Sequence, residues 1–520
     1  MTRCRWVEVT LLIAVVSMMM GCQSDRVDAQ AAGAPATVTV ADPPESGEEW
    51  SPPADLEVTT DTYYGVYLAG AKAGWQHTTI SNGVWRGEPV VYFVNDVSLK
   101  ISMMGQTVRQ GILQQVIYSA DGTPLRGHYE QSGTLSQVVE AEFSDEAVRW
   151  KRKTKAGMTE GEIPIGEGAS LVDPDLAMRD ALPEVGDEMA FRAFEPMMMQ
   201  LITGSYKVVG EERITVHGTE YDCHRIAGAL GVTGSMEIWR DKVTGEPVRV
   251  LSPAAQQEML RETEEMALSG LEEGAEYTPD LAADTRVVVD EPISSPDRRM
   301  DLKLRVSGIP SADVLITDER QTWSEVEKQE DGRYTATVTV RVPPVPATVE
   351  GGLPDSPAEY LAATAMIEAS DTAIIAKAEE ILGDVDEPVE MARLLGEGVH
   401  RLVRSDASVG AIRSASEVLS DPRGVCRDYA ALYAGLARAA GIPTKFAAGI
   451  VYWNQPGAPG FYYHAWNEVN LDGEGWIAVD STRPTVWPVD ATHIKFAEGD
   501  VSSMTDVIGL IGSLKIEVLE

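Results

Sequence analysis

Positive charge is scarce in this 520-residue sequence. The chain carries 43 lysines and arginines against 81 aspartates and glutamates, which gives a formal net charge of −38. A polyanion of this size is repelled by nucleic acid phosphates and by anionic lipid headgroups, so neither is an expected partner. The hydrophobic fraction of 44% is nevertheless that of a folded chain. The length predicts roughly three or four domains.

Long apolar runs are also lacking, with one exception at the N-terminus. Arg3 and Arg5 precede an apolar run from Val9 to Met20, which is too short to span a bilayer and is typical of an export signal. The run ends in Met19-Met20-Gly21-Cys22, which resembles the lipobox of bacterial lipoproteins. The resemblance implies that Cys22 is lipidated and that Gln23 favours an outer-membrane anchor facing the periplasm. Ordinary signal peptidase cleavage nearby is the alternative.

Cysteine is rare as well, with four residues in the whole chain. Cys4 would leave with the signal and Cys22 would carry the lipid. Only Cys223 and Cys426 then remain as thiols, which excludes a disulfide-stapled scaffold. We expect Cys223, which alternates with Tyr221 in a β-like run, to be a small buried side chain.

The middle of the chain shows the pattern of β-structure. Runs such as 64–68 and 90–94 are rich in β-formers and are separated by turn signals such as Ser81-Asn82-Gly83. They predict an antiparallel, strongly curved sheet that resembles the half-barrel domains of bacterial periplasmic proteins. We expect Met197-Met198-Met199 to pack in a core, with a groove for an apolar ligand as the alternative.

Changes in amino-acid composition and in the periodicity of hydrophobic residues divide the chain into segments. Ala-, Pro- and acid-rich residues before 58 predict a flexible tether, and Ser356-Pro357-Ala358-Glu359 has the signals of a helix start. Further helices are predicted at 372–382 and 388–403. The predicted segments are a signal peptide (1–21), a tether (22–57), an antiparallel β domain (58–257), an acidic helix and linker (258–285), a small β module (286–345), an α+β domain (356–505) and a tail strand (506–520).

The stretch around Cys426 carries the chemistry. Gly424 permits a sharp turn, and the Ala-rich residues 426 to 440 predict a buried helix that Gly441 ends. Cys426 is therefore placed at a helix N-terminus, where unpaired N–H groups and the helix dipole favour a thiolate and can receive an oxyanion. Its neighbours Arg427 and Asp428 are expected on the helix surface or in salt bridges.

A nucleophilic thiol needs a base, and the base needs an acceptor that orients it. His464 lies in one predicted strand, and Asp480 ends the next. A four-residue turn at 472–475 would point the two side chains to opposite faces. A three-residue turn at 472–474 would put Trp466 opposite Asp480 and His464 on the same face. The pair therefore predicts the shorter turn, or a β-bulge.

Four motifs together resemble the transglutaminase-like superfamily, whose arrangement is papain-like. They are Gly424-Val425-Cys426, Gly441-Ile442-Pro443, His464-Ala465-Trp466 and Gly475-Trp476-Ile477-Ala478-Val479-Asp480. The resemblance covers the predicted α+β domain and implies a papain-like catalytic domain there; with the β-patterned segments before it, the sequence predicts a multidomain α+β chain. The resemblance also implies a Cys426–His464–Asp480 triad with Trp466 and Tyr463 as substrate-binding candidates. Ser481 departs from the pattern, because the family often has Pro there. A second oxyanion donor is not assigned.

No cofactor is expected. The remaining histidines show no ligand spacing, and neither a zinc motif nor an EF-hand loop occurs; these histidines are His77, His128, His217, His224, His400 and His493.

The sequence thus predicts an exported, lipid-anchored cysteine enzyme that acts on amide bonds of proteins or peptides through a thioacyl intermediate, with hydrolysis favoured over transamidation. A peptide-binding scaffold of the cell envelope is the alternative.

Overall fold

A computed structural model describes most of the chain after the predicted signal and tether. The residues described are 50–103, 106–133, 136–165, 171, 184–230, 234–253, 256–271, 285–349, 353, 358–409, 412–455, 457–471 and 475–519. The predicted signal peptide, the anchor Cys22 and most of the tether lie outside these residues. Strand β1 begins at Ala54, within the segment predicted as tether.

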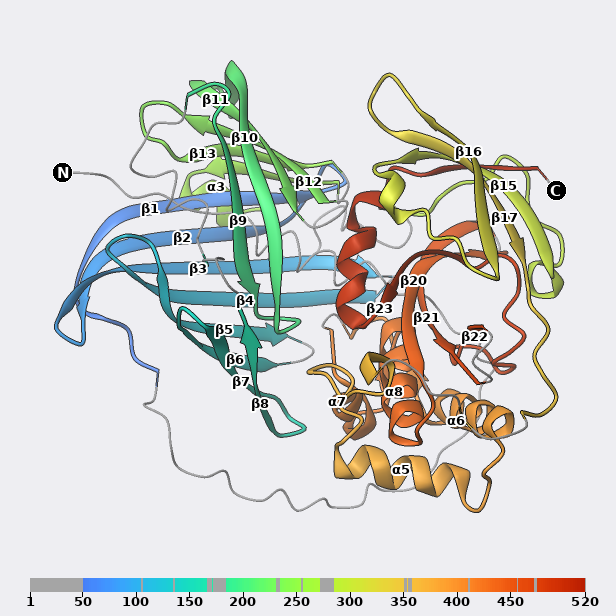
Figure 1. The fold of residues 1–520 in the computed structure, drawn as a ribbon. Helices are drawn as coiled ribbons and strands as arrows, with labels where there is room; N and C mark the ends of the chain where they lie inside the picture. Colours follow the sequence, from blue (N-terminus) through green and yellow to red (C-terminus); the bar gives the residue numbers. More distant parts are fainter. Residues whose placement is uncertain are drawn as a thin grey trace.

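The described part of the chain is mostly β, as Figure 1 shows. Its N-terminal portion forms one 14-stranded sheet in the order β8-β7-β6-β5-β4-β3-β2-β1-β14-β13-β12-β11-β10-β9. Two antiparallel meanders therefore meet where β1 pairs with β14. The strands are β1 (Ala54–Leu68), β2 (Ala71–Trp85), β3 (Glu88–Met103), β4 (Gln106–Ser119), β5 (Pro124–Gly133), β6 (Gln137–Phe143), β7 (Ala147–Lys153), β8 (Met158–Pro164), β9 (Glu188–Glu195), β10 (Gln200–Val216), β11 (Thr219–Leu230), β12 (Gly234–Asp241), β13 (Pro247–Ser252) and β14 (Gln257–Glu262).

Side-chain alternation explains these strands. In β1, Tyr64, Val66 and Leu68 are buried on one face, as a half-buried strand requires. The predicted turn at Ser81-Asn82-Gly83 is wrong, because β2 continues through it to Trp85. The chain turns instead at Arg86 and Gly87, which both have positive φ.

The acidic segment that follows is only partly helical. Its first residues complete β14, and the predicted short helix is α3 (Glu264–Leu268). Glu262 tolerates burial in the strand because the Lys72 ammonium lies 2.8 Å from its carboxylate.

The small β module consists of β15 (Asp301–Ile309), β16 (Gln321–Lys328) and β17 (Tyr334–Arg341), with the short 3-10 helices η1 (Pro296–Arg298) and η2 (Ala312–Val314). The tail strand predicted over 506–520 is shorter in the structure, where β24 (Lys515–Val518) pairs with β15. The order β16-β17-β15-β24 shows that the chain returns to this module after the whole α+β portion.

The α+β portion packs helices against a second sheet, in the order β22-β21-β20-β23. Its helices are α5 (Thr372–Leu382), α6 (Pro388–Leu402), α7 (Ala415–Ser420) and α8 (Cys426–Ala439), with the 3-10 helices η3 (Ala358–Tyr360) and η4 (Val501–Leu510). Its strands are β20 (Thr444–Trp453), β21 (Gly460–Val469), β22 (Ile477–Val479) and β23 (Ile494–Gly499), with a parallel pair β18 (Arg404–Ser405) and β19 (Arg423–Gly424).

The helix expected after Ser356 is wrong, because only the short η3 forms among the described residues there. Met366 and Ile367 are instead buried in a non-helical segment, and the Ala415 N–H donates to the Met366 carbonyl. Burial of these two side chains outweighs the local helix signals. The predicted helices at 372–382 and 388–403 are confirmed as α5 and α6.

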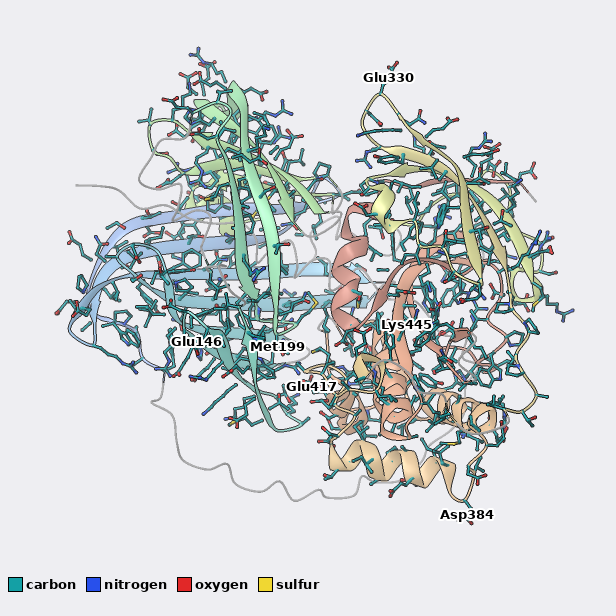
Figure 2. All side chains as sticks on the ribbon, in the orientation of Figure 1. Glu146, Met199, Glu330, Asp384, Glu417 and Lys445 are labelled. Atoms are coloured by element: carbon teal, nitrogen blue, oxygen red, sulfur yellow. The ribbon has the colours of Figure 1, made fainter. Side chains whose placement is uncertain are left out.

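One apolar core runs from the large sheet into the α+β portion. Met197, Met198 and Met199, in the β9–β10 turn, are 3–5% exposed and belong to it, which confirms the core interpretation. Figure 2 labels Met199 and Glu417 near the contact between the two portions. The 3-10 helix η4 contacts β12 on one side and β20 and β23 on the other. None of the described helices is both long and apolar enough to cross a membrane.

Candidate active site

Cys426 is the first residue of α8, as predicted. Gly424 directly before it has φ 153°, and a Cβ there would overlap the Asp428 carboxylate and the Arg413 guanidinium. Asp428 accepts a 2.8 Å hydrogen bond from the Val425 N–H and lies 2.9 Å from Arg413 Nε. This buried ion pair fixes the start of the helix. Asp428 is thus in a salt bridge, but it is not on the helix surface.

Arg427 is buried as well, and its Nη2 donates to the Val409 carbonyl at 2.7 Å. The expectation of a surface position is wrong for this residue. The helix is buried around nearly its whole circumference, because α5, α6, α7 and the sheet all pack on it.

Cys426 forms no disulfide, and its side chain is fully buried. Helix α8 packs across β21, and Asn467 Nδ2 donates to the Ala430 carbonyl at 3.1 Å. Helix α8 therefore packs on the face of β21 that carries Asn467. The helix dipole at this end favours negative charge on the sulfur.

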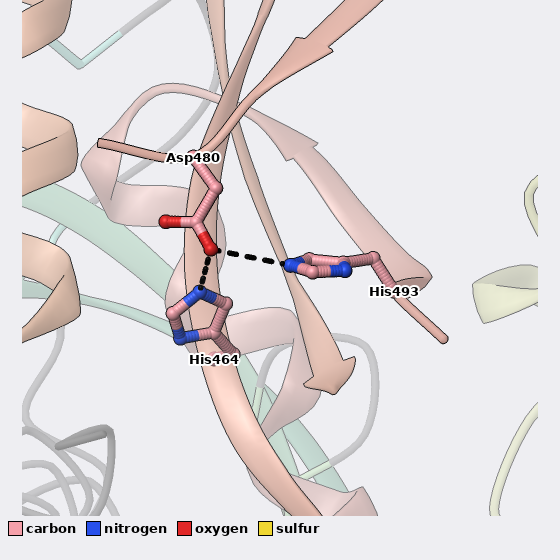
Figure 3. Close-up of side chains that lie close together, drawn as sticks. All are labelled: His464, Asp480 and His493. Atoms are coloured by element: carbon pink, nitrogen blue, oxygen red, sulfur yellow. Dashed lines mark hydrogen bonds and ion pairs between the residues drawn. The ribbon is translucent and has the colours of Figure 1, made fainter. Parts of the chain in front are cut away.

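His464 and Asp480 are brought together by the strand register. Asn467 pairs with Val479, and Val469 pairs with Ile477. Continued by one residue, this register puts Trp466 opposite Asp480, as predicted for the shorter turn. Residues 472–474 themselves lie outside the described residues. His464 Nε2 lies 3.1 Å from Asp480 Oδ2, as Figure 3 shows.

The Asp480 carboxylate is held as an anion. Burial by itself would raise its pKa, but the charge of His464 and the hydrogen bonds from His464 and His493 outweigh burial and hold the pKa well below its usual value. Thr482 adds hydrogen bonds to Oδ1 from its N–H at 3.0 Å and its hydroxyl at 2.7 Å. An anionic Asp480 can stabilise a His464 imidazolium during catalysis.

The two substrate-binding candidates lie on opposite faces of β21. Trp466 shares the face of His464, and the two rings stack with centroids 6.1 Å apart. Tyr463 points to the other face, and its hydroxyl donates to the Leu510 carbonyl at 2.5 Å. Both side chains are buried, so their role in substrate binding stays a prediction. Cys223 is buried on β11 as expected, where burial first and nearby carboxylates second raise its pKa to about 12.

Sequence reasoning missed the second partner of Asp480. His493 Nε2 lies 3.3 Å from Asp480 Oδ2, and Arg483 Nε also lies 3.3 Å from this oxygen. No motif spacing reveals His493, because residues 481–493 fold back irregularly over the sheet before β23 begins.

Two groups of described side chains have metal-ligand atoms within 4.8 Å of one another. His464, Asp480 and His493 form the first, in which the histidines and Asp480 hydrogen-bond to each other. Asp318, Glu468 and Glu498 form the second, and the Lys495 ammonium lies 2.6 Å from each carboxylate. A side-chain cation therefore takes the place that a metal ion would need in this second group. The expectation of no cofactor stays a prediction.

Helix α8 begins at Cys426 and packs on an antiparallel sheet that carries His464, which is hydrogen-bonded to Asp480. Residues 375–481 match the model of the transglutaminase-like superfamily. This part of the chain is therefore a transglutaminase-like domain.

Two solved structures are similar to parts of this chain at low sequence identity. A "putative cysteine protease" from Cytophaga hutchinsonii is 18% identical over 42% of this chain and 83% of its own, with a TM-score of 0.29. A "putative protease" from Parabacteroides distasonis is 13% identical over 72% of this chain and 70% of its own, with a TM-score of 0.18. Agreement at this level carries no information on activity. A comparison with curated protein sequences found no significant match.

Proposed function

We propose that this chain is a cysteine enzyme that cleaves amide bonds of proteins or peptides. The observation that carries the proposal is the 3.1 Å contact between His464 and Asp480. His464 lies on β21, which packs against α8, and the first residue of α8 is Cys426. A thiol at a helix N-terminus, a histidine and an orienting carboxylate are the three parts that thiol catalysis needs.

The chemistry proceeds in two steps. His464 takes the proton of the Cys426 thiol, and the sulfur attacks the amide carbonyl carbon and forms a C–S bond while the helix N–H groups receive the oxyanion. His464 then gives a proton to the leaving nitrogen as the C–N bond breaks. In the second step His464 takes a proton from water, whose oxygen attacks the thioester and releases the acid and the thiolate. An amine in place of water would give transamidation, and we propose that hydrolysis is favoured.

The site is closed in this structure. Cys426, His464 and Asp480 are each at most 1% exposed. A peptide reaches the sulfur only after the surrounding side chains separate. The proposed enzyme therefore alternates between this closed packing and an open one.

Mass-spectrometric mapping of iodoacetamide labelling tests the proposal. Cys223 is an internal reference, since it is a second buried thiol without a histidine–aspartate pair. We expect Cys426 to be labelled faster than Cys223 at about pH 6 to 7, and His464→Ala to abolish the difference, because the thiol then lacks its base. Equal labelling of both cysteines in the native protein, unchanged by His464→Ala, would favour a peptide-binding scaffold.

Turnover needs a second assay, because labelling reports only the thiol. We expect the protein to cleave fluorescein-labelled casein, and we expect Cys426→Ala to remove the cleavage. Cys223→Ala is the matched control and is expected to leave the rate unchanged. Cleavage that survives Cys426→Ala would contradict the proposed nucleophile.

We also propose that the protein is exported and anchored to the outer membrane through a lipid on Cys22. The apolar run before Cys22 and its lipobox-like ending support this proposal. Metabolic labelling with a fatty acid analogue should mark the wild-type chain and not Cys22→Ala, which should appear in the soluble periplasmic fraction. A variant that keeps both the label and the membrane location would refute the anchor.

A further inference from the structure

The Asp480 carboxylate holds a second histidine besides His464. Its Oδ2 lies 3.1 Å from His464 Nε2 and 3.3 Å from His493 Nε2, as drawn in Figure 3. The two rings stand edge to face, with centroids 5.5 Å apart. All three side chains are at most 1% exposed. The proposed chemistry uses only His464 and Asp480, so the role of His493 is open.

Donors surround the carboxylate. Oδ1 accepts from the N–H and the hydroxyl of Thr482, while Oδ2 faces both imidazoles and Arg483 Nε. A carboxylate offers about four lone-pair sites, so these donors fix both its position and its rotation. His493 reaches Oδ2 from another direction than His464 and thus helps to determine where Oδ2 can lie.

His493 is itself held from its other side. Its Nδ1 lies 3.4 Å from Asp490 Oδ1, and Arg483 Nη1 donates to the other oxygen of Asp490 at 2.8 Å. The Trp466 ring stands against the His493 ring at 5.3 Å. Histidines and carboxylates therefore alternate in a buried row: His464, Asp480, His493 and Asp490. The contacts along this row hold the two imidazole rings in place.

The small β module supports this row. Arg320, just before β16, donates to the carbonyls of Val489 and Asp490. The Ala491 N–H donates to the Arg299 carbonyl at 2.7 Å. The segment that leads into His493 is therefore clamped by a module that is separate in sequence from the transglutaminase-like residues 375–481.

We propose that His493 is a positioning residue of this site, which fixes Asp480 so that Asp480 can orient His464. The inference rests on the proposed function. His493 takes no direct part in the proposed reaction. It acts through the Asp480 oxygen. The small β module then serves catalysis, because it holds the segment that carries His493.

Two polar substitutions separate positioning from simple packing. His493→Gln places an amide donor near the position of Nε2, within reach of Asp480. His493→Asn places its amide near the position of Nδ1, so it keeps a polar group but loses that reach. We expect His493→Asn to lower kcat on fluorescein-labelled casein by about 10- to 100-fold with KM unchanged, as for other residues that orient a reacting group, and His493→Gln to stay within about threefold of wild type. Iodoacetamide labelling of Cys426 should follow the same order.

The controls distinguish the two proposals. His400→Gln alters a histidine whose Nδ1 lies 3.2 Å from the Ser481 carbonyl of the same segment, and it should leave both readouts unchanged. If Cys426→Ala and His464→Ala have no effect, the proposed function fails. If those two variants are inactive but His493→Asn labels and turns over like wild type, the function stands and the positioning role fails. Equal losses in His493→Gln and His493→Asn would also overturn it, because they would indicate a packing role.

Discussion

Glu195 shows how a single buried carboxyl can make stability depend on pH. It ends β9, is 2% exposed, and its Oε1 accepts from the Met197 N–H at 2.8 Å. Burial raises its pKa to about 7, although the Met197 hydrogen bond opposes this shift. The folded protein therefore binds this proton more tightly than the unfolded chain, whose value is 4.5. Stability falls as pH rises from about 4.5 to about 7.

Replacing Glu195 with Gln should remove this decrease in stability with rising pH. The amide cannot ionise and still offers an oxygen to Met197. We expect a gain in the free energy of unfolding on the order of 3 kcal/mol at about pH 8 and little change at about pH 5, measured by urea denaturation. Glu188→Gln is the control, because Glu188 is exposed on the same strand. A gain of equal size at both pH values would contradict the raised pKa.

Gly424 is the residue on which the position of Cys426 depends most directly. Its φ of 153° and the carboxylate beside it leave no room for a Cβ. We expect Gly424→Ala to cost about 1 to 3 kcal/mol of stability and to slow Cys426 labelling, since the helix start must shift. Gly383→Ala tests the effect of a positive φ without steric overlap, because Gly383 has φ 56° but open space around it. Wild-type labelling of Cys426 in Gly424→Ala would show that the turn does not position the thiol.

At the scale of elements, a buried charge cluster joins two sheets. Lys495 on β23 is 1% exposed and contacts Asp318 of the small module, Glu468 of β21 and Glu498 of β23. Burial alone would lower its pKa, but the three carboxylates raise the pKa above its usual value. The lysine therefore keeps its charge and neutralises carboxylates from three elements.

Removing this lysine should be costly. Lys495→Met removes the cation that the three carboxylates share, so we expect a loss of about 3 to 5 kcal/mol in thermal or urea unfolding. Lys377→Met, which breaks an exposed pair with Glu380, should cost less than about 1 kcal/mol. Similar losses in the two variants would mean that the cluster contributes no more than a surface pair.

The sequence predicted the elements whose side chains repeat in a regular pattern. The Ala-rich run after Cys426 gave α8, and the parity of His464 and Asp480 gave the register of β21 and β22. Where tertiary contacts override local signals, prediction failed. Ser81-Asn82-Gly83 forms strand because its neighbours pair across β2 and β3. His493 was missed because its contact with Asp480 depends on an irregular segment that has no period.

At the scale of the molecule, a buried ion pair ties the large sheet to the α+β portion. Arg152 on β7 is 1% exposed, and its Nη2 lies 2.5 Å from the Glu417 carboxylate at the start of α7. Its Nε donates to Gln137, whose amide in turn contacts the Met197 sulfur. Side-chain contacts therefore link the β9–β10 turn, β7 and α7 where the large sheet meets the α+β portion.

Breaking this link should loosen the contact without unfolding either portion. We expect Arg152→Met to lower the free energy of unfolding by about 3 to 5 kcal/mol, because it leaves the Glu417 charge without this partner, and to speed hydrogen exchange in β7 and α7. Arg149→Met on the same strand breaks an exposed pair with Glu162 and should change little. Unchanged exchange in Arg152→Met would show that the two portions are held by apolar packing alone.

The pairing of β15 with β24 has a consequence for how the protein reaches this structure. Leu304 is the partner of Val518, so two neighbouring strands lie about two hundred residues apart in sequence. Closing so long a loop is entropically unfavourable, and such contacts form late and slowly. The module that clamps the His493 segment is therefore completed only when β24 returns to pair with β15. We therefore expect the proposed orientation of Asp480 by His493 to be among the late features of folding.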